Sequence, residues 1–192
     1  MIKQAIIPLA GLGTRLLPLT SVLPKELLPI NGKPSIVYIL DECIKSGIKE
    51  IIFIISKRKN IIKKYFYNDN FYKNLIKRKG GDKRLKFEYS KIKKYKKMIK
   101  FVYQNSPRGT GDAVLKCKNL IKSKYFLMLM PDDLIINSNC SASLLKLHNK
   151  YKSSIIASKK VDKKDVSRWG IFNLKKINKR NYFYYIKEKK YY

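Results

Sequence analysis

The chain has 192 residues, a formal net charge of +31 and 45% hydrophobic residues. This length favours a single domain, and the hydrophobic share argues against a disordered chain despite the charge. No run approaches about 18 apolar residues, so we expect no membrane span, and Ala5–Ala10 is too short for a signal peptide. The three cysteines are odd in number and widely spaced, which indicates reduced thiols in a cytoplasmic protein.

The net positive charge has two possible interpretations. A surface this basic binds polyanions, nucleic acid above all. Alternatively, the charge reflects composition, because Lys, Ile, Asn and Tyr are abundant while Ala is scarce, as AT-rich codons favour. Arginine is the better residue for bidentate phosphate contacts, yet it supplies only 7 of the 44 basic residues. The sequence therefore favours the compositional reading and predicts no specific nucleic-acid partner.

Apolar runs bounded by turn residues alternate with helical patterns. The helix at 35–46, for example, places Ile36, Ile39, Leu40 and Cys43 on one face and is followed by Gly47. In chain order, the patterns predict a strand at 4–9, helix at 35–46, strand at 50–56, helix at 60–66, strand at 101–104, helix at 112–121, strand at 125–130, helix at 141–151, and strands at 154–159, 171–174 and 182–187.

The segment 73–100 is Lys-rich, weakly periodic and interrupted by two glycines. We expect it to be a surface excursion, helical in part, within a single domain covering residues 1–192. The strand–helix alternation elsewhere predicts an α/β fold: a mainly parallel, Rossmann-like sheet with helices on both faces. Ligands of such sheets bind outside the carboxyl ends of the strands.

Three predicted strand ends carry unusual residues. The first strand is followed by Gly11–Arg15, where glycines let the backbone approach an anion and Arg15 offers a planar fork for phosphate oxygens. This is neither the Rossmann fingerprint nor a Walker loop, and a structural turn explains it equally well.

The other two strand ends lie later in the chain. Gln104 opens a Gly-rich loop and can read the edge of a nucleobase, whereas Asp112 fits a helix N-cap. Asp132 and Asp133 follow a very apolar strand, where carboxylates can hold Mg²⁺ together with substrate phosphates, or form a turn. The only histidine, His148, sits in a Lys-rich helix and is expected to be solvated.

Two motifs in register carry a family resemblance. Gly11–Pro18, read as Gly-Leu-Gly-Thr-Arg-Leu-Leu-Pro, and Pro24–Pro29, read as Pro-Lys-Glu-Leu-Leu-Pro, resemble the signature of sugar-1-phosphate nucleotidyltransferases. Lys33-Pro34 and Ser167–Ile171 are similar to the bacterial glucose-1-phosphate uridylyltransferases within that group. The resemblance follows the chain in order and is weakest at 67–98.

The resemblance implies an activity: uridylyl transfer from UTP to glucose 1-phosphate, giving UDP-glucose and pyrophosphate with Mg²⁺ as cofactor. It also implies a role for each matching position. The implied nucleotide-binding residues are Gly11, Gly13, Thr14, Glu26, Gln104 and Gly109; Arg15 and Lys25 would act on the triphosphate as catalytic residues; Asp132 would bind the metal; and Gly170 and Lys189 would bind the sugar phosphate.

Two departures stand beside the resemblance. Asp112 occupies a position where the family commonly has a neutral or imidazole side chain, which adds a negative charge near the nucleotide loop. The chain also ends where the family continues, so we expect a C-terminally truncated fold, with a homo-oligomer interface largely missing. The alternatives are a relative that uses another nucleotide and an inactive remnant that binds anions through charge.

Overall fold

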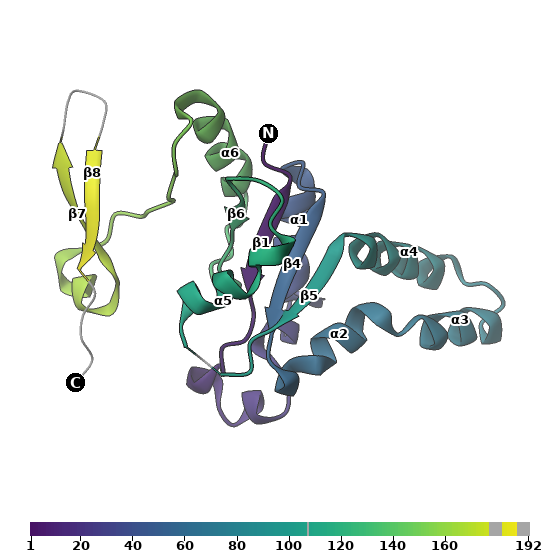
Figure 1. Ribbon diagram of the computed structural model, residues 1–192. Coiled ribbons are helices and arrows are strands. Elements are labelled where there is room, and N and C mark those ends of the chain that lie inside the picture. The colour runs from purple at the N-terminus through teal and green to yellow at the C-terminus, as the bar shows by residue number, and fades with distance from the viewer. Residues whose placement is uncertain (107, 177–181, 188–192) are drawn as a thin grey trace. The chain divides into compact units, whose positions relative to one another are not determined.

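A computed structural model describes residues 1–106, 108–176 and 182–187 (Figure 1). The chain divides into two compact units, Met1–Ile155 and Ile156–Tyr192, and each is described by itself. The single domain over 1–192 therefore stays a prediction. No helix in the described ranges is long and apolar enough to cross a membrane.

The first unit is built on a four-stranded sheet. Its strands are β1 (Gln4–Pro8), β4 (Glu50–Ile55), β5 (Ile99–Tyr103) and β6 (Leu127–Met128), in the order β5-β4-β1-β6. Every pair is parallel. The chain moves outward from β1 through β4 to β5 and then returns to the other side of β1 for β6, which creates a topological switch point between β1 and β6.

Side chains of β1 and β4 alternate between two hydrophobic clusters. Ile7 and Phe53 belong to a large cluster, whereas Ile6 and Ile52 belong to a smaller one. Successive side chains of a strand point to opposite faces, so the sheet is buried on both sides. The predicted α/β class, with a parallel sheet and helices on both faces, is confirmed.

Helices of two groups cover these faces. Residues of α1 (Ser35–Lys45), α2 (Asn60–Tyr67), α4 (Lys83–Met98) and α6 (Cys140–Tyr151) join the large cluster. Ala113 and Cys117, in and just after α5 (Thr110–Lys116), join the smaller one. The shorter elements of this unit are η1 (Thr14–Leu16), η2 (Leu19–Ser21), η3 (Lys25–Leu27), the antiparallel pair β2 (Pro29–Ile30) and β3 (Lys33–Pro34), η4 (Lys57–Lys59) and η5 (Lys118–Leu120).

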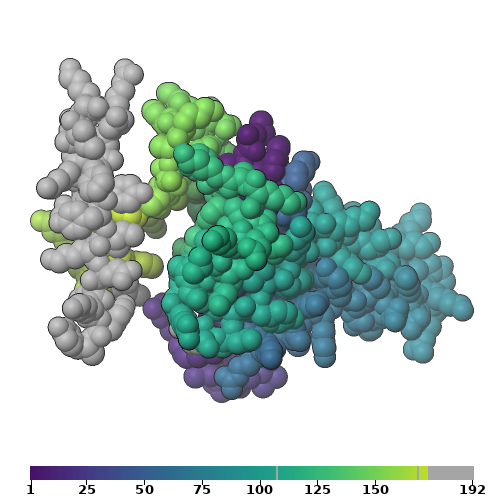
Figure 2. Space-filling view, in the orientation of Figure 1, coloured from purple at the N-terminus to yellow at the C-terminus, as the bar shows by residue number. Residues whose placement is uncertain are grey.

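The Lys-rich segment forms a helical hairpin of α3 (Asp69–Arg78) and α4, which projects from the body of the first unit (Figure 2). Tyr72 and Tyr89 stack across it, with ring centroids 5.2 Å apart. Ile92 and Tyr95 are buried in the core, so α4 is more than the surface excursion we expected. The weak periodicity arises because only the last turns of α4 reach the sheet.

Three predicted elements differ from the structure. The strand expected at 125–130 pairs only over Leu127–Met128. The helix expected at 112–121 begins at Thr110 with Gly109 as N-cap, and a separate turn, η5, follows it. The strand expected at 154–159 is wrong: these residues have no helix or strand assignment and are mostly exposed, because a short apolar triplet between polar neighbours lacks a sheet to complete.

The second unit holds η6 (Lys163–Arg168) and a hairpin of β7 (Ile171–Lys176) and β8 (Tyr182–Lys187). The two strands are antiparallel, with Ile171 opposite Lys187. The strands expected at 171–174 and 182–187 are therefore confirmed.

Candidate active site

A cleft of about 210 Å³ opens at the carboxyl ends of β1, β5 and β6, beside the switch point of the sheet. The three strand ends singled out in the sequence all contribute to it, together with the loop that carries Lys25. Its lining consists of Pro8, Ala10, Gly11, Lys25, Glu26, Gln104, Gly109, Thr110, Ala113, Met130, Pro131 and Asp132. The predicted convergence of these segments on one crevice is confirmed.

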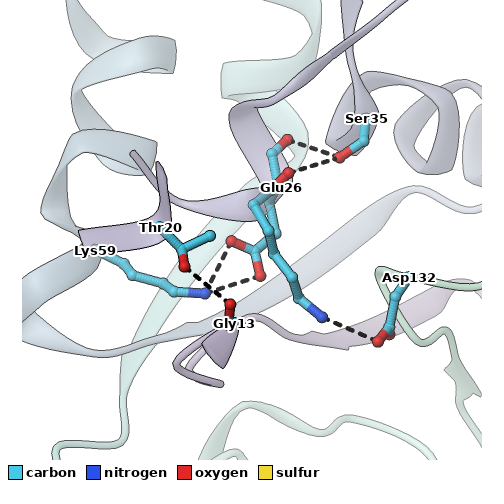
Figure 3. A network of polar contacts seen from close by, with 7 residues as sticks. Gly13, Thr20, Glu26, Ser35, Lys59 and Asp132 are labelled. Atoms are coloured by element: carbon cyan, nitrogen blue, oxygen red, sulfur yellow. Dashed lines mark hydrogen bonds and ion pairs between the residues drawn. The ribbon is translucent and has the colours of Figure 1, made fainter. Parts of the chain in front are cut away.

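The loop after β1 supplies open backbone. A Cβ at Gly11 would meet no atom within 4 Å, so this glycine leaves free space in the cleft wall. Gly13 has φ +71° and its carbonyl accepts a hydrogen bond of 2.9 Å from Thr20 Oγ1 (Figure 3). Thr14 and Arg15 follow in η1 and are exposed. This loop can therefore admit an anion closely, and Arg15 is exposed in the turn that follows it.

Lys25 and Asp132 form an ion pair across the cleft. Lys25 Nζ lies 2.9 Å from Asp132 Oδ2, although the residues are 107 positions apart in the chain. Burial raises the pKa of Asp132, but Lys25 and the more distant Arg15 outweigh this effect and hold the pKa below its usual range. The two groups predicted to hold phosphate and metal thus neutralise each other.

Glu26 and Lys59 form a second ion pair, which is more deeply buried than the first. Lys59 Nζ lies 2.8 Å from each carboxylate oxygen of Glu26, whose side chain is 1% exposed (Figure 3). Burial lowers the pKa of Lys59, and Glu26 opposes that shift. Ser35 Oγ donates to the backbone oxygen of Glu26 at 3.0 Å. These contacts fix η3, and hence the backbone of Lys25, to the carboxyl end of β4.

Gln104 is buried and its amide is held by the loop that follows it. Its Nε2 donates to Gly109 O at 3.1 Å and to Asp112 Oδ2 at 2.7 Å. Gly109 has φ +91°, which favours glycine, and it is the N-cap of α5. Asp112 is therefore not the helix N-cap that the sequence suggested. It lies in the first turn of α5, where its carboxylate reaches back to Gln104.

The donor set at Asp132 fits one kind of metal. The parts of the chain that the structure describes contain no group of three His, Cys, Asp or Glu side chains able to hold an ion. Asp132 is 57% exposed in its side chain, and Asp133 adjoins it. One or two carboxylates are enough for Mg²⁺, which keeps several waters and shares substrate phosphates. The site thus fits Mg²⁺ that arrives with a nucleotide.

The cleft does not test the two residues predicted for the sugar phosphate, and the only histidine is not part of its lining. Gly170 directly precedes β7 in the second unit and is exposed. Lys189 lies outside the described residues, so the sugar-phosphate role of both stays a prediction. His148 Nδ1 lies 2.8 Å from Ser153 O, and its ring packs against Tyr125, so the histidine stabilises the end of α6 and lies outside the cleft lining.

Sequence reasoning missed Lys59 and the role of Asp112 as a partner of Gln104. One lysine among so many carries no local signal. Asp112 was interpreted as a helix N-cap and as a departure from the family, and neither interpretation pairs it with Gln104. The roles predicted for Glu26 and the other cleft residues in nucleotide binding stay predictions, although the observed contacts of Glu26 are to Lys59.

The chain is similar to known proteins over nearly its whole length. A family profile of nucleotidyl transferases matches residues 4–189. The chain is 39% identical over 177 residues to a UTP–glucose-1-phosphate uridylyltransferase of Streptococcus pyogenes, covering 88% of this chain and 57% of that protein.

Solved structures give the same picture. The UTP-bound UGPase of Acinetobacter baumannii is 29% identical, with a TM-score of 0.84, covering 93% of this chain and 63% of that one. A UDP-glucose pyrophosphorylase complexed with UDP-glucose is 29% identical, with a TM-score of 0.73, covering 95% of this chain and 66% of that one. The chain spans about 60% of the length of these relatives. With matching profile, sequence and fold, this chain belongs to the nucleotidyl transferase family and resembles its UTP–glucose-1-phosphate uridylyltransferases.

Proposed function

We propose that the cleft binds UTP and that the chain transfers uridylyl to glucose 1-phosphate, giving UDP-glucose and pyrophosphate. The observation that carries this proposal is the meeting of Lys25, Gln104 and Asp132 at the switch point of a parallel sheet. Relatives named as uridylyltransferases, one of them UTP-bound, support UTP as the nucleotide. The relative complexed with UDP-glucose supports glucose as the sugar.

The reaction needs positioned charge more than proton transfer. A phosphate oxygen of glucose 1-phosphate attacks the α-phosphorus of UTP, and the bond to the pyrophosphate oxygen breaks. The second pKa of a phosphate monoester is about 6, so the nucleophile is already ionised at neutral pH. A general base is not required, which agrees with a cleft lining that contains no histidine among the described residues. Positioning and charge neutralisation then supply the rate enhancement.

Each charged residue has a defined task in this scheme. Arg15 would bind phosphate oxygens from the loop after β1, with the backbone of Gly11 and Gly13 alongside. Lys25 would leave Asp132 and bind the triphosphate. Asp132 would hold Mg²⁺, which supplies neutralisation of the phosphate charge when bound. Gly170 and Lys189 are proposed for the sugar phosphate.

The three cysteines are free, and Cys43 and Cys117 are buried. Free thiols are typical of a reducing compartment, which supports a cytoplasmic location as part of this proposal.

The test is formation of UDP-glucose and pyrophosphate from UTP, glucose 1-phosphate and Mg²⁺. In parallel, equilibrium binding of UTP should be compared with that of ATP and inorganic triphosphate at low and moderate salt. We expect UTP to bind more tightly than both, and this preference to survive added salt. Absence of turnover, together with equal and salt-sensitive binding of all three polyanions, would show that only charge attracts them.

A further inference from the structure

We infer that Asp112 determines nucleobase specificity, because it holds the Gln104 amide so that only the oxygen Oε1 remains to contact the base. This inference rests on the proposed binding of a nucleotide in the cleft. The Gln104 amide can donate and accept hydrogen bonds, whereas its neighbours, the Asp112 carboxylate and the Gly109 carbonyl, can only accept them.

The side-chain amide of Gln104 has no free hydrogen-bond donor. Its Nε2 carries two hydrogens, and both are used: one points to Asp112 Oδ2 at 2.7 Å and the other to Gly109 O at 3.1 Å. A carboxylate and a backbone carbonyl can only accept hydrogen bonds. Turning the amide over would place its oxygen against two acceptors, so the observed orientation is the one that these neighbours permit.

The side-chain oxygen Oε1 of Gln104 remains available as an acceptor. No described residue donates a hydrogen bond to Gln104 Oε1, and this oxygen is not among the buried atoms that lack a partner. The residue is only 6% exposed overall, yet it lines the cleft. Gln104 therefore presents a fixed acceptor to whatever occupies this part of the cleft.

The pyrimidine bases differ in the hydrogen-bonding groups on their pairing edges. Uracil carries an N–H donor at N3, at the centre of its pairing edge, and thymine has the same edge. Cytosine carries a lone pair at N3 and can offer a donor only from its exocyclic amine, which requires the base to shift. A fixed acceptor therefore favours uracil and thymine over cytosine. Without Asp112, the amide could turn over and offer Nε2 to cytosine.

The experiment measures dissociation constants of UTP, CTP and 5-methyl-UTP for the wild-type chain and for Asp112→Asn. Asparagine keeps the shape of aspartate, but its amide can donate as well as accept, so it no longer imposes one orientation on Gln104. We expect wild type to bind UTP and 5-methyl-UTP alike and to prefer both over CTP. In Asp112→Asn the preference should fall roughly tenfold, the size of one charged hydrogen bond.

Two controls separate positioning from charge. Each comparison is a ratio between triphosphates, so the loss of one negative charge affects both ligands equally. Glu88→Gln removes an exposed charge on α4 and should leave the ratio unchanged. In a Gln104→Leu background, Asp112→Asn should have no further effect on the ratio, because its effect passes through Gln104.

The outcomes are distinguishable from failure of the proposed function. Equal binding of UTP and CTP by wild type, or an unchanged ratio in Asp112→Asn, overturns the role of Asp112 while uridylyl transfer stands. Absence of binding by all three nucleotides overturns both.

Discussion

The ammonium of Lys25 lies 2.9 Å from the carboxylate of Asp132, which joins η3 to the loop after β6 across the cleft. This contact cannot persist during the proposed reaction, because Lys25 is needed at the triphosphate and Asp132 at the metal. We therefore expect Lys25 to compete with Mg²⁺ for Asp132 when no nucleotide is bound. Nucleotide binding would release that competition by drawing Lys25 to the phosphates.

Replacement of Lys25 by Met should separate these two effects. UTP binding and turnover should fall, the latter by roughly a hundredfold, since one preorganised charge is lost. Affinity of the nucleotide-free chain for Mn²⁺, measured by electron paramagnetic resonance, should rise because Asp132 is freed. Unfolding free energy should change by less than about 1 kcal/mol, as for other partly exposed pairs. Unchanged or weaker Mn²⁺ binding would contradict the competition, and Asp132→Asn provides the control in which the site itself is removed.

The buried pair of Lys59 and Glu26 should matter for stability. Lys59→Met leaves the Glu26 carboxylate buried without a partner, which typically costs about 3 kcal/mol or more. Urea unfolding should show this loss, whereas Lys91→Met, which breaks the exposed pair with Glu88, should cost less than about 0.5 kcal/mol. The double variant Lys59→Met/Glu26→Gln should be more stable than the sum of the single losses predicts. Additive losses would show that the two side chains do not act as a pair.

Alanine substitutions at Gly11 and Gly109 should separate an effect on UTP binding from an effect on backbone stability. Gly109 has φ +91°, so Gly109→Ala should destabilise the protein by roughly 1–2 kcal/mol. A Cβ at Gly11 meets nothing within 4 Å, and its φ lies outside the left-handed region, so Gly11→Ala should unfold like wild type. That Cβ would nevertheless occupy the cleft, and UTP affinity should fall about tenfold or more. Normal UTP binding by Gly11→Ala would place the nucleotide elsewhere.

Glu50 should contribute to a loss of unfolding free energy as the pH falls. Burial alone would raise its pKa, but hydrogen bonds from Lys122, Lys100 and Gln4 outweigh burial and lower the pKa to about 2 from an ordinary value of 4.5. The unfolded chain therefore binds the proton more tightly, so the stabilisation is complete above about pH 4.5 and is lost as pH falls toward about 2. Because the lysine partners are largely exposed, screening limits it to roughly 1–2 kcal/mol.

Urea unfolding at several pH values between 2.5 and 6, about the window set by this linkage, measures the effect. Glu50→Gln should be less stable near neutral pH and should show a flatter dependence across that window. An equally steep loss of unfolding free energy in both proteins would show that other carboxylates cause the loss of stability at low pH.

The sequence determined the class of fold and the places where chemistry could occur. Strands β1 and β4 are buried on both faces, so their sequences are almost continuously apolar. Such short apolar runs between turn residues predict buried strands. Gly11, Gln104 and Asp132 stood out because glycines and polar residues directly after apolar strands are unusual. The fold class, with the ligand rule for parallel sheets, was enough to bring these three strand ends together.

Only the tertiary structure decided which groups contact one another. Lys59 is one of many lysines, and nothing near it in the chain marks its distant partner, Glu26. The pairing of Lys25 with Asp132 and the turn of Asp112 toward Gln104 depend on side-chain directions that emerge when separate segments pack. The pattern of apolar residues indicates which side chains are buried. Which hydrogen bonds and ion pairs a side chain forms depends on the particular atoms that it contacts in the folded chain. The sequence therefore indicated which strand ends form the site, but it did not indicate which side chains pair within the site.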